Sequence, residues 1–343
     1  MTVALIEIVS LVLPPLYFLS HGYLYLKISS GLRLGNKGKW MSGSILFILM
    51  ALSLPAVMEV THRISTRAGT AYQIAAFGWI GIALVGVMTF LAIDALRVLL
   101  KYSSRGSLNL DAKARTFSHK LTSVAVTFGA LMIVGAVSAY GLFEALRPPT
   151  QNRIMIDVPG IQRDLTIVQL SDAHLGPVFG AERLAAILAE VRRIAPDLLV
   201  LTGDILDADI TMGDARTYID MLSAIKTRYG TIAVLGNQEE SVGIDEVSET
   251  FKAVGIRLMR DTLVTLENGL QIAGVDDYGV ARDLSNRRRL DALLEERSVK
   301  RPLLLLAHDP TFFEDEADRG VFLQLSGHTH GGQLMLAGNI GAG

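Results

Sequence analysis

Four long apolar runs occupy the first part of the chain. Each is dominated by Leu, Ile, Val, Ala, Phe and Gly, and Glu7 is the only charged residue inside them. At about 1.5 Å of rise per residue, roughly 20 helical residues cross a hydrocarbon core of about 30 Å. Four such runs joined by short basic loops argue against the alternative, buried helices of a soluble protein. The predicted transmembrane helices are Val3–Leu26, Met41–Met58, Tyr72–Ile93 and Leu121–Leu142.

The pattern changes after Arg147-Pro148-Pro149-Thr150, a sequence that ends a helix and begins a linker. Short apolar runs then alternate with amphipathic stretches, which is typical of an α/β domain. The predicted strands are Leu165–Leu170, Leu198–Leu201, Ile232–Leu235, Leu270–Ala273, Leu303–Ala307 and Val321–Leu325. The predicted helices are Glu182–Ile194, Asp214–Arg228, Asp245–Val254 and Asp283–Arg297. We therefore expect a four-span region at 1–146, a linker and entry strand at 147–163, and a folded domain at 164–343.

Charge separates the same two regions. The whole chain has 32 Lys and Arg against 34 Asp and Glu, but the first 146 residues alone carry a net charge of +7 and the remainder −9. This asymmetry indicates two physical environments rather than one domain. The basic residues of the first region lie in short gaps between apolar runs, so we expect no nucleic-acid partner. The chain has no Cys, which excludes disulfides, Cys-ligated zinc and thiol nucleophiles.

The loop charges also predict an orientation. Ten Lys and Arg residues lie in the first and third loops between the predicted spans, whereas the second loop has only Arg63 and Arg67. Basic loops stay in the cytoplasm, so both ends of the bundle should face the opposite side. We expect a multi-pass protein of the plasma (inner) membrane with an extracytoplasmic folded domain.

Potential metal ligands follow five of the predicted strands. In an open α/β sheet, ligands bind at the carboxyl ends of the strands, so these side chains should converge at one edge. Any single Asp-x-His or Gly-Asp is common in ordinary loops, and the prediction depends on all of them recurring at equivalent places. Oxygen and imidazole donors without thiols suit Mn, Fe or Zn, and their number indicates two ions. The candidate ligands are Asp172, His174, Asp204, Asn237, His308, His328 and His330.

At these residues the sequence resembles the calcineurin-like metallophosphoesterase superfamily, most closely its membrane-attached bacterial branch. The matching blocks stand in the family's order and span roughly 154 to 336. They are Ser171-Asp172-Ala173-His174, Thr202-Gly203-Asp204, Leu235-Gly236-Asn237-Gln238, Ala307-His308-Asp309-Pro310 and Gly327-His328-Thr329-His330. The resemblance implies a two-sheet β-sandwich flanked by helices.

The resemblance also implies a division of roles. One divalent ion would be held by Asp172, His174 and His330, a second by Asn237, His308 and His328, and Asp204 would bridge them. A phosphate ester would then be hydrolysed by a metal-bridging water without a covalent enzyme intermediate. The candidate catalytic residues are Asn237, Gln238 and His308.

Two departures from the family pattern affect the expected activity. Gln238 stands where the family usually has a His, and Gln donates hydrogen bonds but does not transfer protons at neutral pH. General-acid help is therefore in doubt, and good leaving groups should suffer less from its loss. The chain also ends soon after the last block, at Gly343, where relatives continue into further strands. We expect either a truncation or a sheet completed in another way.

The favoured function is hydrolysis of a phosphodiester or pyrophosphate, with a lipid or envelope component as the expected substrate, because a membrane tether raises the local concentration of such molecules. The expected partners are this phosphate ester and the lipid bilayer. An alternative is a catalytically weak membrane sensor or scaffold with a structural metal site, motivated by Gln238 and the short end. Transport through the bundle has less support, because the spans lack paired charges.

Overall fold

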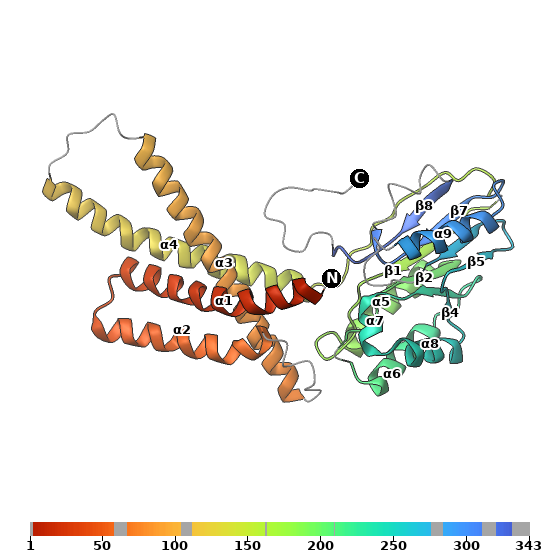
Figure 1. Ribbon diagram of the computed structural model, residues 1–343, viewed down its shortest axis with the longest axis horizontal. Coiled ribbons are helices and arrows are strands. Elements are labelled where there is room, and N and C mark those ends of the chain that lie inside the picture. Colours follow the sequence, from red (N-terminus) through yellow and green to blue (C-terminus); the bar gives the residue numbers. More distant parts are fainter. Residues whose placement is uncertain are drawn as a thin grey trace. The chain divides into compact units, whose positions relative to one another are not determined.

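The computed structural model describes residues 3–57, 67–103, 112–161, 163–208, 210–275, 284–310 and 320–330 (Figure 1). The chain divides into two compact units, Met1–Arg147 and Pro148–Gly343. This division falls one residue after the end predicted for the N-terminal region.

Long helices make up the described part of the first unit. They enclose a small core to which each helix contributes, and they expose large apolar side chains such as Phe47, Leu91 and Met132 on the outside. A water-soluble bundle buries most such side chains, and this distribution indicates membrane association. The helices are α1 (Val3–Gly31), α2 (Asn36–Val57), α3 (Arg67–Ser103) and α4 (Ala112–Leu146). Their core residues are Leu24, Leu46, Ala83, Phe90 and Ala130.

Two segments among the described residues are long and apolar enough to cross a membrane, Ala68–Leu99 in α3 and Ser123–Leu146 in α4. Only 22% and 11% of their most apolar windows are buried inside the protein, unlike a core helix of a soluble domain. The predicted first and second spans include residues whose side chains the structure does not describe. Met58, which ends the second span, and Arg63 of the second loop also lie outside the described residues. The four-span arrangement therefore stays a prediction.

The helices extend beyond the apolar runs into the charged flanks, which were expected to be loops. Arg97 and Lys101 belong to α3, because Arg and Lys are good helix formers and continue a helix that the apolar run begins. Asp94, one residue beyond the predicted third span, forms an ion pair with Lys27 of α1 and accepts a hydrogen bond from the Tyr23 hydroxyl at 2.9 Å. This pair links α1 to α3 at the ends of the apolar segments.

The described residues of the second unit form two sheets of four strands each. The first has the order β1-β2-β3-β4 and is parallel throughout. The second has the order β5-β6-β7-β8, with β5 antiparallel to β6 and the others parallel. The strands of the first sheet are Ile167–Leu170, Leu198–Thr202, Thr231–Val234 and Arg257–Leu258. Those of the second sheet are Thr262–Thr265, Gln271–Gly274, Leu303–Leu306 and Val321–Leu325.

Alternation along the buried strands places the two sheets between layers of helices. In β2, Leu198 and Val200 join the core shared with the second sheet, while Leu199 and Leu201 pack on the opposite side with α5, α6 and α8. In the second sheet, Leu303 and Leu305 of β7 pack against α9. This is the sandwich flanked by helices that the resemblance implied (Figure 1). The helices are α5 (Ala181–Ile194), α6 (Met212–Ser223), α7 (Asn237–Val242), α8 (Ile244–Ala253) and α9 (Leu284–Glu296).

Some elements differ from the predicted ones. The described residues between α4 and β1 contain no strand, where the sequence predicts an entry strand within 147–163. Most of these described residues are exposed. Helix α6 ends at Ser223 rather than at Arg228. The expectation about the end of the chain concerns residues 331–343, which lie outside the described residues.

Candidate metal centre

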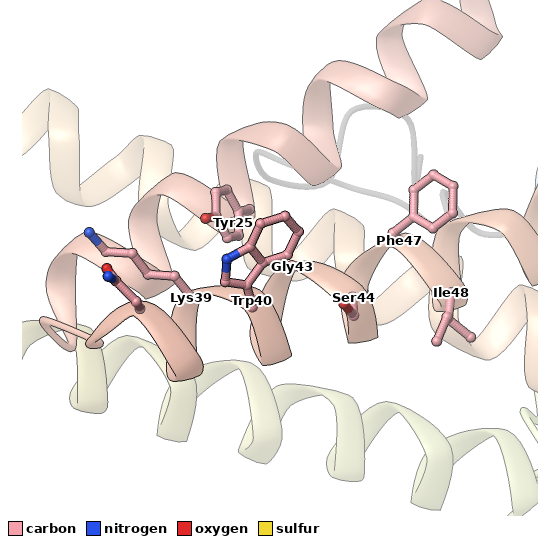
Figure 2. A pocket seen from close by; sticks show the side chains of 8 residues that line it. Tyr25, Lys39, Trp40, Gly43, Ser44, Phe47 and Ile48 are labelled. Carbon is pink, nitrogen blue, oxygen red and sulfur yellow. The ribbon is translucent and has the colours of Figure 1, made fainter.

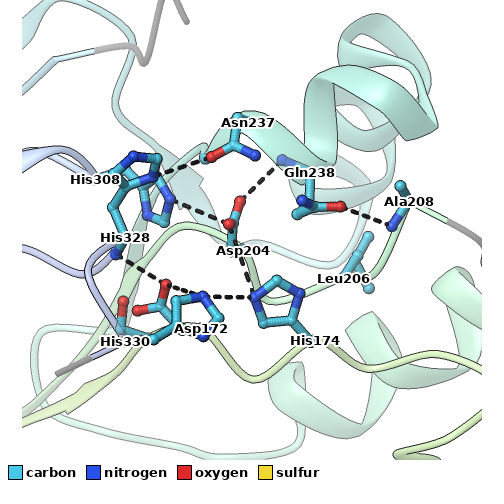
Figure 3. A network of polar contacts seen from close by, with 12 residues as sticks. Asp172, His174, Asp204, Leu206, Ala208, Asn237, Gln238, His308, His328 and His330 are labelled. Atoms are coloured by element: carbon cyan, nitrogen blue, oxygen red, sulfur yellow. Dashed lines mark hydrogen bonds and ion pairs between the residues drawn. The ribbon is translucent and has the colours of Figure 1, made fainter. Parts of the chain in front are cut away.

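The predicted ligands follow the carboxyl ends of parallel strands from both sheets. Asp172 and His174 follow β1, and Asp204 follows β2. Asn237 is the first residue of α7, just after β3. The remaining three come from the second sheet, His308 after β7 and His328 and His330 after β8. Residues far apart in the sequence therefore meet at one edge of the sandwich (Figure 3).

Backbone hydrogen bonds hold the loops after β1 and β2 together. The amide of Asp172 donates to the Gly203 carbonyl at 3.1 Å, and the amide of His174 donates to the Asp204 carbonyl at 3.0 Å. Leu175 and Leu206 then continue the parallel pairing beyond the strands. These bonds fix the relative positions of three of the proposed ligands.

Five of the proposed ligands have left-handed backbone conformations. Their φ values lie between 43° and 68°, a region that non-glycine residues seldom occupy and that Asp and His tolerate better than most. Such conformations persist where the surrounding structure enforces them, and they cluster at functional sites. The five residues are Asp172, His174, Asp204, His328 and His330.

Asp172, His174, Asp204 and His330 form a tight group. One potential ligand atom of each lies within 4.8 Å of the others. The Nε2 atoms of His174 and His330 are 3.1 Å apart, and His330 Nε2 is 3.5 Å from Asp172 Oδ1. Two carboxylates and two imidazoles that converge this closely can hold one cation. The three terminal ligands of this group are those implied for the first metal.

Asn237, His308 and His328 lie around the other side of Asp204 (Figure 3). His328 Nδ1 is 3.2 Å from Asn237 Oδ1, and His308 Nε2 is 3.2 Å from Asp204 Oδ2. The same Asp204 oxygen lies 3.8 Å from His174 Nε2 in the first group. One carboxylate oxygen therefore faces ligands of both groups.

The electrostatics of Asp204 and His308 are coupled. Burial opposes ionisation of Asp204, but the adjacent His308 ring and a hydrogen bond from the Gln238 amide hold its pKa below the usual value. Burial alone would lower the pKa of His308, whereas the neighbouring Asp204 carboxylate raises it to about 9. The site thus strongly favours a negative Asp204 and attracts positive charge to the position beside it.

His308 is oriented to present one ring nitrogen to the site. Its Nδ1 donates to the Thr202 carbonyl at 2.8 Å. In the neutral tautomer, this bond leaves the lone pair on Nε2, as is usual for metal-binding His. Nε2 is buried and has no hydrogen-bond partner of suitable geometry. A buried polar atom without a partner is unfavourable, and a cation beside Asp204 would satisfy it.

Gly236 permits the close approach of these groups. A Cβ atom at this position would lie 2.3 Å from Asp204 Oδ1 and 2.9 Å from His308 Nε2. Real side chains do not approach this closely, so only glycine fits between the two proposed ligands. The donor types, the unpartnered Nε2 and this close spacing all fit divalent cations held at the two groups.

Gln238 borders the site, and its backbone and its side chain make different hydrogen bonds. Its backbone amide donates to Asp204 Oδ1 at 2.8 Å, which holds this carboxylate in place. Its side-chain oxygen accepts from the Ala208 amide at 3.3 Å, so the side chain is directed toward the loop after β2 (Figure 3). The backbone of Gln238, rather than its side chain, makes the observed contact with a proposed ligand.

Glu239 has a role at the site that the sequence pattern did not reveal. The side chain is 1% exposed, and its carboxylate accepts from the amides of Asp204, Leu206 and Gly236 at 2.8 to 2.9 Å. Burial raises the pKa of Glu239 to about 7, against the effect of these hydrogen bonds. The available signal was its place as the third residue of a helix that follows Gly236, where a Glu side chain caps the helix.

Comparison with known proteins agrees with this geometry. The profile of the calcineurin-like phosphoesterase family matches residues 165–332. The chain is 38% identical over 177 residues to an uncharacterized metallophosphoesterase of Aquifex aeolicus, covering 51% of this chain and 66% of that protein. It is 29% identical over 219 residues to a transmembrane protein with metallophosphoesterase domain of Danio rerio, covering 60% and 50%. The chain thus spans less than two thirds of the length of these two relatives.

A third relative is matched over most of its length. The chain is 32% identical over 222 residues to the uncharacterized metallophosphoesterase YkuE of Bacillus subtilis, covering 61% of this chain and 76% of that protein. The family profile spans the five sequence blocks that carry the proposed ligands. By this similarity, the chain belongs to the calcineurin-like phosphoesterase family.

Proposed function

We propose that this chain hydrolyses phosphate esters at a site that holds two divalent cations. The observation that carries the proposal is the position of Asp204, whose Oδ2 faces His308 at 3.2 Å and His174 at 3.8 Å from opposite groups of ligands. Asp172, His174 and His330 would hold one ion, and Asn237, His308 and His328 the other. Mn, Fe and Zn all suit this set of oxygen and imidazole donors.

Cations bound at this site would supply charge neutralisation for the phosphoryl oxygens and a more acidic water. The chain's own residues position these groups. Asp204 is held by the Gln238 amide, and His308 by the Thr202 carbonyl, so both enter the reaction already oriented. His328 is fixed through its amide, which donates to Asp172 Oδ1 at 2.8 Å. Phosphoryl transfer depends mainly on such positioning and on electrostatic stabilisation, which a site without a nucleophilic side chain can provide.

The proposed substrate class is a phosphodiester or pyrophosphate of a lipid or envelope component. Gln238 does not supply a proton, so the leaving oxygen departs with a negative charge. Phosphodiesters with acidic leaving groups and pyrophosphates stabilise this charge best. Membrane attachment supports a membrane-associated substrate through its raised local concentration.

We also propose that the bundle spans the membrane four times and that the phosphoesterase domain is extracytoplasmic. The two apolar segments of α3 and α4 and the likeness to a transmembrane relative indicate membrane association. The excess of basic residues in the first and third loops supports the orientation.

The test combines metal analysis with turnover. The full chain would be purified in detergent, stripped with a chelator and reloaded with Mn, Fe or Zn. We expect about two bound ions per chain and metal-dependent hydrolysis of bis(p-nitrophenyl) phosphate, with slower hydrolysis of the monoester. Metal binding without turnover of any ester would favour the sensor or scaffold reading instead. Failure to bind metal would contradict both.

A further inference from the structure

An open groove lies between α1 and α2, far along the chain from the phosphoesterase blocks. Its volume is about 710 Å³. Tyr25 contributes from α1, and all other lining residues belong to α2 (Figure 2). These α2 residues are Asn36, Lys39, Trp40, Gly43, Ser44, Phe47 and Ile48.

The lining changes from polar to apolar along α2. Asn36 and Lys39 stand in its first turn, and Phe47 and Ile48 lie about three turns further on (Figure 2). The span from residue 36 to residue 48 is roughly 18 Å of helix, close to the thickness of one leaflet of a hydrocarbon core. The groove therefore has the polarity and the length of an amphiphile with a polar head and one apolar chain.

Aromatic residues mark where the change occurs. Trp40 is 79% exposed and lies beside Tyr25 at the polar end (Figure 2). Trp and Tyr gather at membrane interfaces, where an apolar ring and a polar tip both find suitable surroundings. Phe47 and Ile48, exposed by 63% and 53%, would lie deeper, where lipid chains are.

Gly43 lets the Tyr25 ring lie close to the backbone of α2. A Cβ atom at this position would lie 3.2 Å from Cε2 of the Tyr25 ring, so a larger residue would push that ring aside. Ser44, the next residue, is also small. The groove thus has a narrow floor between the Tyr25 ring and the backbone of α2.

Lys39 determines the charge of the occupant. It is exposed, and the structure shows no ion pair for it within the described residues. Lys37 and Arg33 are also nearby in the sequence, and the first turn of a helix carries partial positive charge. An apolar protein helix laid in the groove would bury Lys39 and Asn36 without a counter-charge, whereas a lipid phosphate supplies one.

We propose that this groove binds an anionic phospholipid, with its phosphate at Lys39 and Asn36 and one acyl chain along Phe47 and Ile48. The site is separate from the phosphoesterase chemistry, and it rests on the proposed insertion of α1 and α2 into the membrane. Bound lipid would fix the depth of α2 at the interface and fill the space beside Tyr25.

The experiment uses Trp40 as the reporter. The chain has two Trp residues, so Trp79→Phe leaves Trp40 as the only one. The full-length protein would be reconstituted in phosphatidylcholine vesicles containing increasing fractions of dibrominated phosphatidylglycerol or dibrominated phosphatidylcholine. We expect Trp40 fluorescence to be quenched by the anionic lipid with a relative binding constant about fivefold higher, as one Lys close to an anionic group provides.

Two variants with the same loss of charge separate a site from general attraction. Lys39→Gln should abolish the preference for phosphatidylglycerol. Lys37→Gln should retain it, because Lys37 does not line the groove although it lies only two residues away. If both variants lost the preference for phosphatidylglycerol equally, the proposal would be overturned in favour of diffuse attraction to the basic loop. Equal quenching by both lipids in the Trp79→Phe protein would also overturn it.

Further experiments test for other occupants of the groove and for an effect of the Trp79→Phe substitution on lipid binding. Inorganic phosphate should not compete with the lipid, since it lacks the acyl chain, and full competition would overturn the lipid assignment. Cross-linking between copies of the Ser44→Cys variant would show a second copy in the groove instead. Native mass spectrometry of chains that retain Trp79 should show a retained phosphatidylglycerol that Lys39→Gln loses and Lys37→Gln keeps. Absence of bound phosphatidylglycerol from the protein that retains Lys39 would contradict the proposal.

Discussion

Asp204 is the side chain on which both groups of proposed ligands converge. Its Oδ2 faces His308 and His174, and its Oδ1 is held by the Gln238 amide. An amide in its place would preserve the shape of the site but remove the negative charge that two cations would share. The chemistry of the site therefore depends on this charge more than on any other single group.

Asp204→Asn should consequently abolish metal-dependent turnover and lower metal occupancy. The loss of metal affinity should exceed the roughly 10- to 100-fold loss that follows removal of a metal ligand's hydrogen-bond partner. Metal analysis and hydrolysis of bis(p-nitrophenyl) phosphate would measure both effects. Asp220→Asn, the same change at an exposed position of α6, is the control and should leave both unchanged. Full activity with two bound ions in Asp204→Asn would refute the shared-carboxylate arrangement.

Gln238 tests whether the reaction proceeds without a general acid. If it does, the rate should fall steeply as the leaving-group pKa rises, because charge accumulates on the departing oxygen. Gln238→His should then raise kcat/KM for poor alkyl leaving groups by about 100-fold, the contribution of one positioned acid, and help nitrophenyl esters much less.

The measurement is kcat/KM of both proteins across a series of esters. Metal content should not change, because the backbone amide that holds Asp204 is kept in the variant. An equal effect on every ester would show that the side chain acts by binding or positioning, in line with its contact to the Ala208 amide.

At the scale of elements, the six-residue helix α7 depends on one buried carboxylate. Glu239 accepts hydrogen bonds from three backbone amides, two of which belong to the loop that carries Asp204. Without it, these amides would be buried and unpaired. The helix therefore acts as a brace between β3 and the loop after β2.

Glu239→Ala should lower the free energy of unfolding of the domain by about 3 kcal/mol, since each buried unsatisfied donor costs about 1 to 3 kcal/mol and some relaxation is expected. Chemical denaturation would measure it. Glu240→Ala removes the exposed neighbour and should have little effect. If both variants were equally stable, the three hydrogen bonds would not support the loop as described.

The sequence predicts the long, strongly patterned elements well and the short ones poorly. The strands β1, β2, β3, β6, β7 and β8 all overlap their predictions, because each lies in a mostly apolar run. Strand β4 has two residues, and β5 is partly exposed at both ends, so neither forms an apolar run. Helix α7 is too short for its periodicity to register, which is why Glu239 was missed.

The candidate site was predictable for a different reason. Its ligands recur at the ends of strands, so their spacing alone brings them to one edge. The predicted ligands do meet there, in two groups around Asp204. Which atoms face one another, such as His308 Nε2 and Asp204 Oδ2, depends on side-chain rotation and could not be derived from spacing.

For the whole molecule, the proposed orientation follows from the distribution of basic residues. A reporter that is active only outside the cytoplasm should be active when fused after Thr150, because ten basic residues hold the first and third loops inside. Fusion after Gly35, in the first loop, should instead give activity from a cytoplasm-only reporter. The reverse pattern would invert the topology and change the pool of available substrates.

The left-handed residues of the site have a consequence for how folding and metal binding are coupled. The contacts that impose these conformations join protein groups to protein groups, as in the bonds from Asp172 to Gly203 and from His174 to Asp204. The loops are therefore preorganised by the sandwich, unlike a zinc finger, where the metal itself supplies the folding free energy. Chelation should abolish turnover yet leave the circular dichroism spectrum of the chain unchanged. Readdition of the ion should restore activity at the rate of metal binding, not at the slower rate of refolding. Loss of secondary structure on chelation would show instead that the ions fold the site.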